Sequence, residues 1–328
     1  MVGILREWAA ITMVMVIMGS WCPEVAASDQ VDEMMADALG AGETGVANPA
    51  SSVGSIGSPA VIALGSRYDI SGGAGLGPDN ARMIHASAAD SKSGPIGLGL
   101  YVGQMGSQPT SITGELPGWK LPEEDIENSA TSTTIGGSLA MGRTAKPPSS
   151  AGSYGAAQHW KTRTWAVGAG VVYRSQMTRY GDETTSLNVN VGVAARVLNA
   201  FNLSLVGLNL IPQDFDGAPM MVGGGLRLAP DDLWGLEADV HADLDSPKNG
   251  VGWISRVGAE VIPGGMVPLR VGFVNDPERD LRLVTTGAGL GNETLMLEYA
   301  LRVGVDRVSE DELPDERMWH TIGLRLAF

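Results

Sequence analysis

Asp239, His241 and Asp243 are the residues whose types and spacing could most directly support chemistry in this sequence. They alternate along one segment, so an extended strand would project all three side chains from the same face. Two carboxylates beside an imidazole can bind a metal ion or transfer a proton. The polar face of a strand that lines a hydrated lumen gives the same pattern, and we favour that interpretation. With no Ser/His/Asp arrangement in the sequence either, we expect no metal, no cofactor and no enzymatic activity.

Further charged residues follow the same alternation in neighbouring segments. Rings of charged side chains set the selectivity of many pores, so these positions are candidate lumen and selectivity residues. Together with Asp239, His241 and Asp243, they are Glu237, Arg256, Glu260, Arg270, Arg282, Glu298 and Arg302. Alternatively, the mixed charges only rigidify a packed interior, and the pattern is compatible with both roles.

The elements that must position these residues alternate with a period of two. Between Thr294 and Val305, Leu295, Leu297 and Tyr299 share one face with later apolar residues, whereas Glu298 falls on the opposite face. Similar runs recur from Tyr68 onward and are about 10 to 12 residues long, the length that a tilted strand needs to cross a membrane. A soluble sheet has strands of roughly half that length. The pattern therefore predicts an all-β, antiparallel transmembrane barrel.

The connections between these runs alternate between tight turns and longer polar loops, which is typical of outer-membrane barrels. We expect about fourteen strands, with both ends of the barrel sequence on the periplasmic side. The first five are expected near 66–77, 80–90, 95–106, 153–162 and 164–175. This assignment leaves Gly106–Ser153 as a long external loop that folds over the mouth or contacts a partner.

The first 27 residues have the features of a secretory signal peptide. Arg6 precedes an apolar stretch, Trp8–Met18, that is too short to span a bilayer, and Ala27 closes a small-residue cleavage site. The only cysteine, Cys22, lies within this segment. We therefore expect an exported chain whose mature form has no thiol.

Residues 28–65 differ from the rest of the chain because they are rich in small residues and have no strong period. We expect them to form a compact plug inside a barrel made by residues 66–328, since small residues pack closely against lumen walls. A loosely ordered periplasmic arm is the alternative. The whole chain has 45 glycines among 328 residues and a net charge of −15, which argues against a nucleic-acid partner.

The last strand ends on an aromatic residue and has one apolar face. Ile322, Leu324, Leu326 and Phe328 share that face. This ending resembles the C-terminal strand signal of bacterial outer-membrane proteins, which implies the barrel assembly machinery as a partner.

Several short motifs resemble the long-chain fatty-acid outer-membrane transporter family. They are Ala38–Ala47, Ser58-Pro59-Ala60 with the apolar residues after it, Pro268–Phe273, Gly287–Gly291, Glu298–Ala300 and His320–Arg325. The resemblance implies a fourteen-stranded barrel with an N-terminal hatch. The family carries an Asn-Pro-Ala motif in that hatch, where this chain has Ser58, Pro59 and Ala60.

On this basis we expect a monomeric barrel in a Gram-negative outer membrane that admits small hydrophobic molecules passively past its plug. A non-transporting structural barrel, or one that serves secretion or assembly, is the alternative. The remaining expected partners are outer-membrane lipid and lipopolysaccharide. A divalent-cation bridge from lipopolysaccharide to the acidic runs at 123–125 and 309–312 is one interpretation of these runs, and solvated external loops are the one that we favour.

Overall fold

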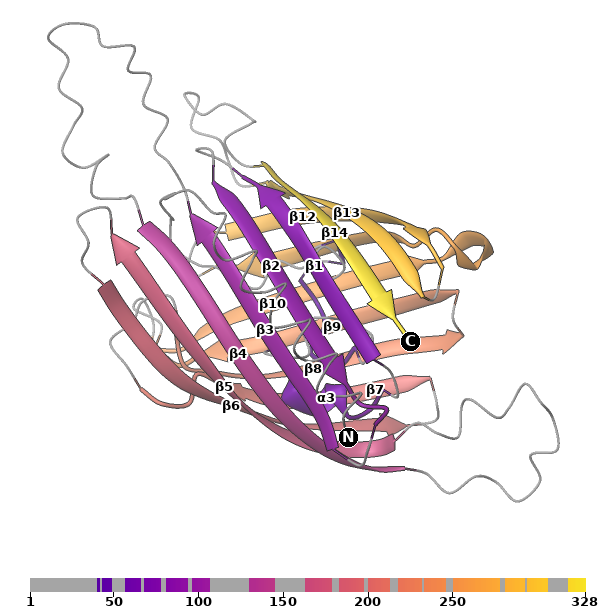
Figure 1. Cartoon of the computed structure of the whole chain (residues 1–328), viewed down its shortest axis with the longest axis horizontal. Helices are drawn as coiled ribbons and strands as arrows, with labels where there is room; N and C mark the ends of the chain where they lie inside the picture. Colours follow the sequence, from indigo (N-terminus) through magenta and orange to yellow (C-terminus); the bar gives the residue numbers. More distant parts are fainter. Residues whose placement is uncertain are drawn as a thin grey trace, which may run out of the picture.

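Fourteen antiparallel strands close into a barrel in which each strand pairs with its sequence neighbours and β1 pairs with β14 (Figure 1). The computed structural model describes residues 40–41, 43–48, 57–65, 68–77, 81–93, 96–106, 130–144, 163–178, 183–197, 200–212, 218–231, 233–245, 250–277, 281–292, 294–305 and 318–328. The expected signal peptide, residues 1–27, lies outside these ranges. The predicted all-β barrel and its strand number are confirmed.

The strands vary in length, and β4 to β6 are the longest. Their bounds are β1 (Tyr68–Leu76), β2 (Arg82–Asp90), β3 (Ile96–Gly106), β4 (Ala130–Thr144), β5 (Arg163–Thr178), β6 (Glu183–Val197), β7 (Phe201–Leu208), β8 (Met221–Asp231), β9 (Trp234–Asp243), β10 (Gly252–Val261), β11 (Leu269–Asp276), β12 (Leu281–Gly291), β13 (Leu295–Gly304) and β14 (Met318–Ala327). A 3-10 turn, η4 (Pro263–Gly265), lies between β10 and β11.

The expected fourth strand was misplaced. β4 runs from Ala130 to Thr144, inside the segment that we predicted to be a long external loop, and it pairs with β3 and β5 along its length. The residues on its outward face are, in order, Thr133, Ile135, Gly137 and Leu139. Thr133 and Gly137 alternate with the two apolar residues, which weakens the hydrophobic alternation in the sequence. The predicted strand at 153–162 lies outside the described residues.

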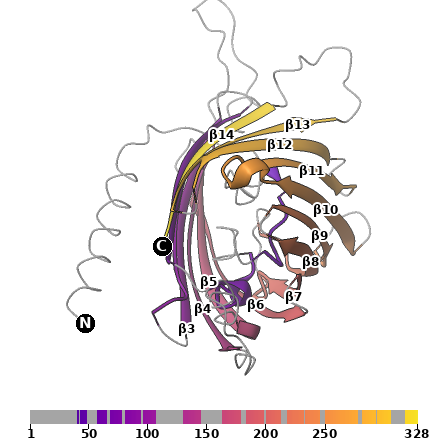
Figure 2. The ribbon, with the colours of Figure 1, turned by 90° about the vertical axis from the view of Figure 1, so that its right-hand side faces the viewer.

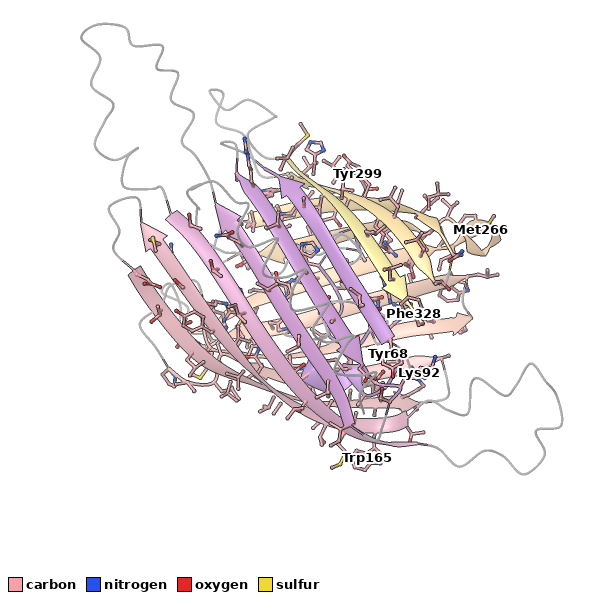
Figure 3. All side chains as sticks on the ribbon, viewed as in Figure 1. Tyr68, Lys92, Trp165, Met266, Tyr299 and Phe328 are labelled. Atoms are coloured by element: carbon pink, nitrogen blue, oxygen red, sulfur yellow. The ribbon has the colours of Figure 1, made fainter. Side chains whose placement is uncertain are left out.

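The outer surface of the barrel is apolar because the alternation turns every second side chain away from the lumen. On β13, for example, Leu297 and Tyr299 are exposed, whereas Glu298 and Ala300, which alternate with them, are buried. The stick view shows such side chains projecting outward around the wall (Figure 3). Exposed leucine, valine and isoleucine side chains occur on most of the strands, as expected for a surface that contacts lipid. Within the described part of the chain, no helix is long and apolar enough to span a membrane.

The barrel closes between its first and last strands. Gly72 on β1 lies opposite Leu324 on β14, and the backbones of Tyr68 and Phe328 exchange hydrogen bonds of 3.1 and 2.9 Å. Both chain ends of the barrel therefore lie at one rim, which we call the terminal rim; the other is the distal rim. Figure 2 looks into the barrel and shows part of the segment before β1 enclosed by the strands.

Within the described residues of the enclosed segment, the short helix α3 (Pro59–Ile62) lies against β3 to β6. Ala60 to Ile62 of the helix and the next two residues, Ala63 and Leu64, are buried and form one apolar cluster with Ala140, Ala166 and Ala194 of the wall. Small wall residues allow this contact, since a Cβ on Gly168 would lie only 2.6 Å from the Ala60 nitrogen. The described part of residues 28–65 is thus packed within the barrel, with α3 on the side of β3 to β6.

Candidate functional site

Five charged side chains form a continuous chain of ion pairs across the lumen face of β8 to β13. Arg227 on β8 contacts Glu237 on β9 and lies 3.6 Å from Glu260 on β10. Arg270 on β11 then pairs with Glu260 at 2.7 Å and with Glu298 on β13 at 2.8 Å. The signs alternate along the whole series, so each arginine neutralises two carboxylates. Side-chain exposures are all between 5% and 15%, so water screens these pairs weakly.

The plug contacts this chain of ion pairs at its Glu237 end. Asn48 donates a hydrogen bond of 2.8 Å from Nδ2 to Glu237 Oε1, the same oxygen that Arg227 contacts. The backbone nitrogens of Gly45 and Val46 both donate to Asp239 Oδ2, at 2.9 and 3.2 Å. Residues 43–48, the plug turn, are therefore bound to two successive inward-facing carboxylates of β9.

Glu43 provides the plug turn's own charge. Its carboxylate lies between two wall arginines, at 2.7 Å from Arg302 Nη1 on β13 and 3.8 Å from Arg256 Nε on β10. The Glu43 backbone has a φ of 58°, a left-handed conformation that is unfavourable for a residue with a side chain. The surrounding contacts hold the turn in this conformation, which directs the carboxylate to the two arginines.

Close backbone contact completes the docking of the plug. A Cβ on Gly258 of β10 would lie 2.0 Å from the carbonyl oxygen of Ala41, so only glycine fits at that wall position. Thr285 on β12 donates a hydrogen bond of 3.3 Å to the carbonyl of Gly40. The plug is thus fixed on opposite sides by different forces, with ion pairs and hydrogen bonds toward β8–β13 and mainly apolar contact toward β3–β6.

Part of the lumen face near the distal rim is apolar. Met83, Met105 and Trp319, each one residue in from the distal end of its strand, pack together with Ala81 and Ala300. Further buried apolar side chains occupy inward positions in the distal half of other strands. They are Val206, Met221, Ile254, Val274 and Leu283. The same rim also carries the buried carboxylates Asp243 and Asp276 at the ends of β9 and β11. Arg302 lies opposite Trp319, so a molecule that enters from this end meets an apolar patch bordered by charged side chains.

Nine of the ten predicted lumen residues face inward, and Arg282 is the exception. On β12 the buried positions are Leu283 and Thr285, so Arg282 lies on the outward face with Val284 and is exposed. The prediction placed Arg282 in the lumen because it lies near other charged residues in the sequence, but the strand register turns it to the other side. A lumen role for Arg282 is therefore wrong.

The predicted residues Asp239, His241 and Asp243 do share one buried face. Asp239 binds the plug, and Arg256 Nη1 lies 3.4 Å from His241 Nδ1. Asp243 accepts a hydrogen bond of 3.0 Å from the Asp245 backbone. Among the described residues no group of three or more metal-ligating side chains is arranged to hold an ion.

Sequence reasoning missed Glu43, Asn48 and Arg227. The alternation of β8 is broken by three successive glycines, 223–225, which hid the inward direction of Arg227. Glu43 and Asn48 belong to a segment without periodicity, so no alternation relates them to partners that lie some 190 to 260 residues away. Asn48 does begin an Asn48-Pro49-Ala50 run, the motif that the resemblance places in the hatch, which the prediction matched instead to Ser58-Pro59-Ala60. Of the predicted plug motif, Ser58 bonds Ser204 of β7 at 3.1 Å, and Pro59 and Ala60 begin α3.

The four residues of the predicted assembly signal occupy outward positions at the end of β14. Ile322, Leu324 and Phe328 are exposed by 58%, 48% and 57%, and Leu326 is half-buried. The apolar face predicted for this strand is therefore present, directed away from the lumen. Its role in assembly remains a prediction.

Neither a family model nor a curated protein sequence matches this chain. Solved structures do match its fold over most of its length. The toluene transporter TbuX of Ralstonia pickettii is 12% identical, with 90% of this chain and 97% of that one covered, at a TM-score of 0.57. A FadL homologue from Pseudomonas aeruginosa is 13% identical, with coverages of 92% and 99% and a TM-score of 0.58. The CymD monoaromatic hydrocarbon channel is 9% identical, covers 89% and 98%, and gives 0.53. The resemblance predicted from the sequence is confirmed at the level of the fold.

Proposed function

We propose that this chain is a monomeric outer-membrane barrel that admits small hydrophobic molecules passively, from the distal rim toward the plug. The observation that carries the proposal is the apolar cluster near that rim, built by Met83, Met105 and Trp319 with Ala81 and Ala300. A channel lined only by polar side chains would offer a hydrophobic molecule no such contact. The fold shared with a toluene transporter and a monoaromatic hydrocarbon channel supports the same class of cargo.

A cargo molecule can pass the plug only if part of the plug moves locally. A hydrophobic molecule that reaches the plug turn meets Glu43, Asn48 and the carboxylates of β9, which offer it no favourable contact. The apolar cluster of α3 with Ala140, Ala166 and Ala194 lies beside that turn and is the more compatible route. We infer that the cargo moves along the α3 side of the plug, and that the ion pairs on the other side keep the plug in place.

Uptake of an environment-sensitive apolar dye by Gram-negative cells tests the proposal. Cells that make the protein should accumulate the dye several-fold faster than cells that lack it. Met83→Glu, which places a carboxylate in the apolar cluster, should remove most of the gain because a charge there is poorly solvated. Asn275→Glu adds the same charge near the same rim, outside the lumen, and should leave uptake unchanged. Equal dye uptake with and without the protein would overturn the proposal.

A non-transporting structural barrel is the second candidate, and the buried ion pairs of the plug favour it. A plug that served only to fill the lumen would be held in place by polar contacts such as those of Glu43, Gly45 and Asn48 with the wall. Equal uptake in the dye experiment, together with a barrel that is correctly assembled, is the result that this alternative expects.

A further inference from the structure

Outward-facing basic side chains occur at the distal rim on one sector of the wall, β12 to β2. Arg282 is the second residue of β12, His320 the third of β14 and Arg82 the first of β2, and all three are exposed. Among the strand side chains that the structure describes, these are the only basic ones that face outward at the distal rim. The feature that removed Arg282 from the lumen thus places it at the same rim as two other cationic groups. It does not adjoin them, because Arg282 bonds Val305 whereas His320 lies opposite Leu301, so Arg282 is farther out along the wall.

The strand register brings Arg82 and His320 close together. Leu76, the last residue of β1, lies opposite Arg82 on one side and opposite His320 on the other. Two strand spacings separate their backbones by about 10 Å, a span that a flexible arginine side chain can largely cover. One ligand can therefore contact both residues.

Tyr299 orients the imidazole of His320. The Tyr299 hydroxyl lies 2.7 Å from His320 Nδ1, and the two rings are 6.2 Å apart between centroids. Figure 3 labels Tyr299, which is the fifth of the ten residues of β13. Because Nδ1 is engaged, the Nε2 edge of the imidazole is the one that can meet a ligand outside the barrel.

Toward the terminal rim, the outward positions on these strands become apolar. Val284 follows Arg282 on the same face of β12, and Ile322 follows His320 on β14, with exposures of 41% and 58%. The basic residues therefore lie at the boundary of the lipid-facing surface, the depth of lipid headgroups and of the tyrosines that flank a membrane. An arginine beside hydrocarbon is unfavourable unless an anion accompanies it.

We propose that Arg82, Arg282 and His320 bind the phosphate groups of an anionic lipid in the leaflet at the distal rim. Guanidinium groups bind phosphate oxygens in a bidentate manner, and basic clusters at a membrane surface recognise anionic headgroups. The proposal goes beyond the proposed function, because it requires only that the barrel lies in a membrane and makes no statement about the cargo.

Binding of diphosphoryl lipid A to the purified barrel in detergent, followed by native mass spectrometry, tests the proposal. The double variant Arg82→Ala with Arg282→Ala should bind this lipid about tenfold more weakly than the parent protein, a loss of about 1.4 kcal/mol. The corresponding double lysine variant should recover part of the affinity, since it keeps the charge and loses the bidentate geometry. Lys92→Ala is the matched control, because Lys92 lies beyond the terminal end of β2, 5.9 Å from the centroid of the Tyr68 ring.

Three outcomes would overturn the proposal. They are unchanged binding by the double alanine variant, an equal loss with Lys92→Ala, and equally tight binding of lipid A from which the phosphates were removed. Inorganic phosphate that competes at the same concentration as the lipid would assign the site to a free anion instead. Heat-modifiable gel migration establishes that each variant is folded. Dye uptake should be unchanged in the double alanine variant, so failure here and failure of the proposed function are distinguishable.

Discussion

Glu43 and Arg302 form an ion pair between the plug and the wall, with 2.7 Å between Oε1 and Nη1 and 259 residues of chain between them. Both side chains are nearly buried, at 10% and 13% exposure. The pair connects the plug turn to β13, whereas Asp239 and Glu237 connect it to β9. The turn is therefore bound to strands on two parts of the wall, and Glu43 is the only residue of the plug turn that carries a charged side chain.

Glu43→Gln should loosen the plug turn. The substitution keeps the size of the side chain but removes the charge, and a hydrogen bond to a charged group contributes about 1.5–3 kcal/mol. We expect a thiol at position 46, introduced as Val46→Cys in a Cys22→Ser background, to react with a maleimide about tenfold faster or more when Glu43→Gln is added. Val46 is 7% exposed, so reaction reports opening of the turn.

The matched control for this prediction is Glu183→Gln. Glu183 is an exposed acid on β6 that bonds Ser175 and has no described contact with the plug. The labelling rate should not change in that background. An equal rate in the Glu43→Gln and parent backgrounds would mean that the hydrogen bonds to Asp239 hold the turn without the ion pair.

Arg227→Met should destabilise the barrel more than a typical surface change. It leaves Glu237 and Glu260 close together without their shared cation, and removing one partner of a buried pair costs about 3–5 kcal/mol. The midpoint of urea unfolding in lipid vesicles, read by tryptophan fluorescence, measures the loss. Arg227→Met combined with Glu237→Gln should lose less than the sum of the two single variants, because the pair is coupled. Additive losses would show that the two side chains do not interact.

The barrel could be predicted from the sequence because its strands alternate locally. A run such as Leu295–Gly304 places apolar and polar residues on opposite faces without reference to any other part of the chain. β4 escaped detection because Gly137 and Thr133 occupy lipid-facing positions, where the sequence pattern requires apolar residues. Register is the other limit, since one residue of displacement turns Arg282 from the lumen to the lipid side.

The plug contacts could not be predicted, because they join a segment without periodicity to strands that are far away in the sequence. Nothing in the local sequence of Glu43 or Asn48 indicates Arg302 or Glu237 as a partner. The high glycine content of the chain does not indicate which glycines matter, although Gly258 and Gly168 lie where the plug backbone comes closest to the wall. Long-range pairing of this kind requires the three-dimensional structure.

Gly168→Val should displace α3 without preventing assembly of the wall. Any side chain at position 168 meets the backbone of Pro59 and Ala60 at 2.6 Å, and backbone atoms cannot move aside as a flexible side chain can. Ion conductance in planar bilayers should rise, because the plug no longer seals that side of the lumen. Gly137→Ala is the control, since its Cβ would lie 3.5 Å from Leu100 Cδ2, an ordinary contact on the outer surface. A conductance equal to that of the parent protein would show that α3 does not contribute to the seal.

Phe328→Ala should reduce the yield of assembled barrel while leaving the stability of the assembled protein nearly unchanged. The Phe328 side chain is 57% exposed, so its removal creates no cavity, and the backbone bonds to Tyr68 do not depend on the side chain. A role for the terminal aromatic in recognition by the assembly machinery then predicts a defect during biogenesis alone. The amount of heat-modifiable barrel in the outer-membrane fraction measures yield, and urea unfolding of the purified variant measures stability. Ile322→Ala removes a comparably exposed side chain on the same face of β14 and serves as the comparison for a loss of apolar surface. A large loss of stability without a change in yield would contradict the assembly role.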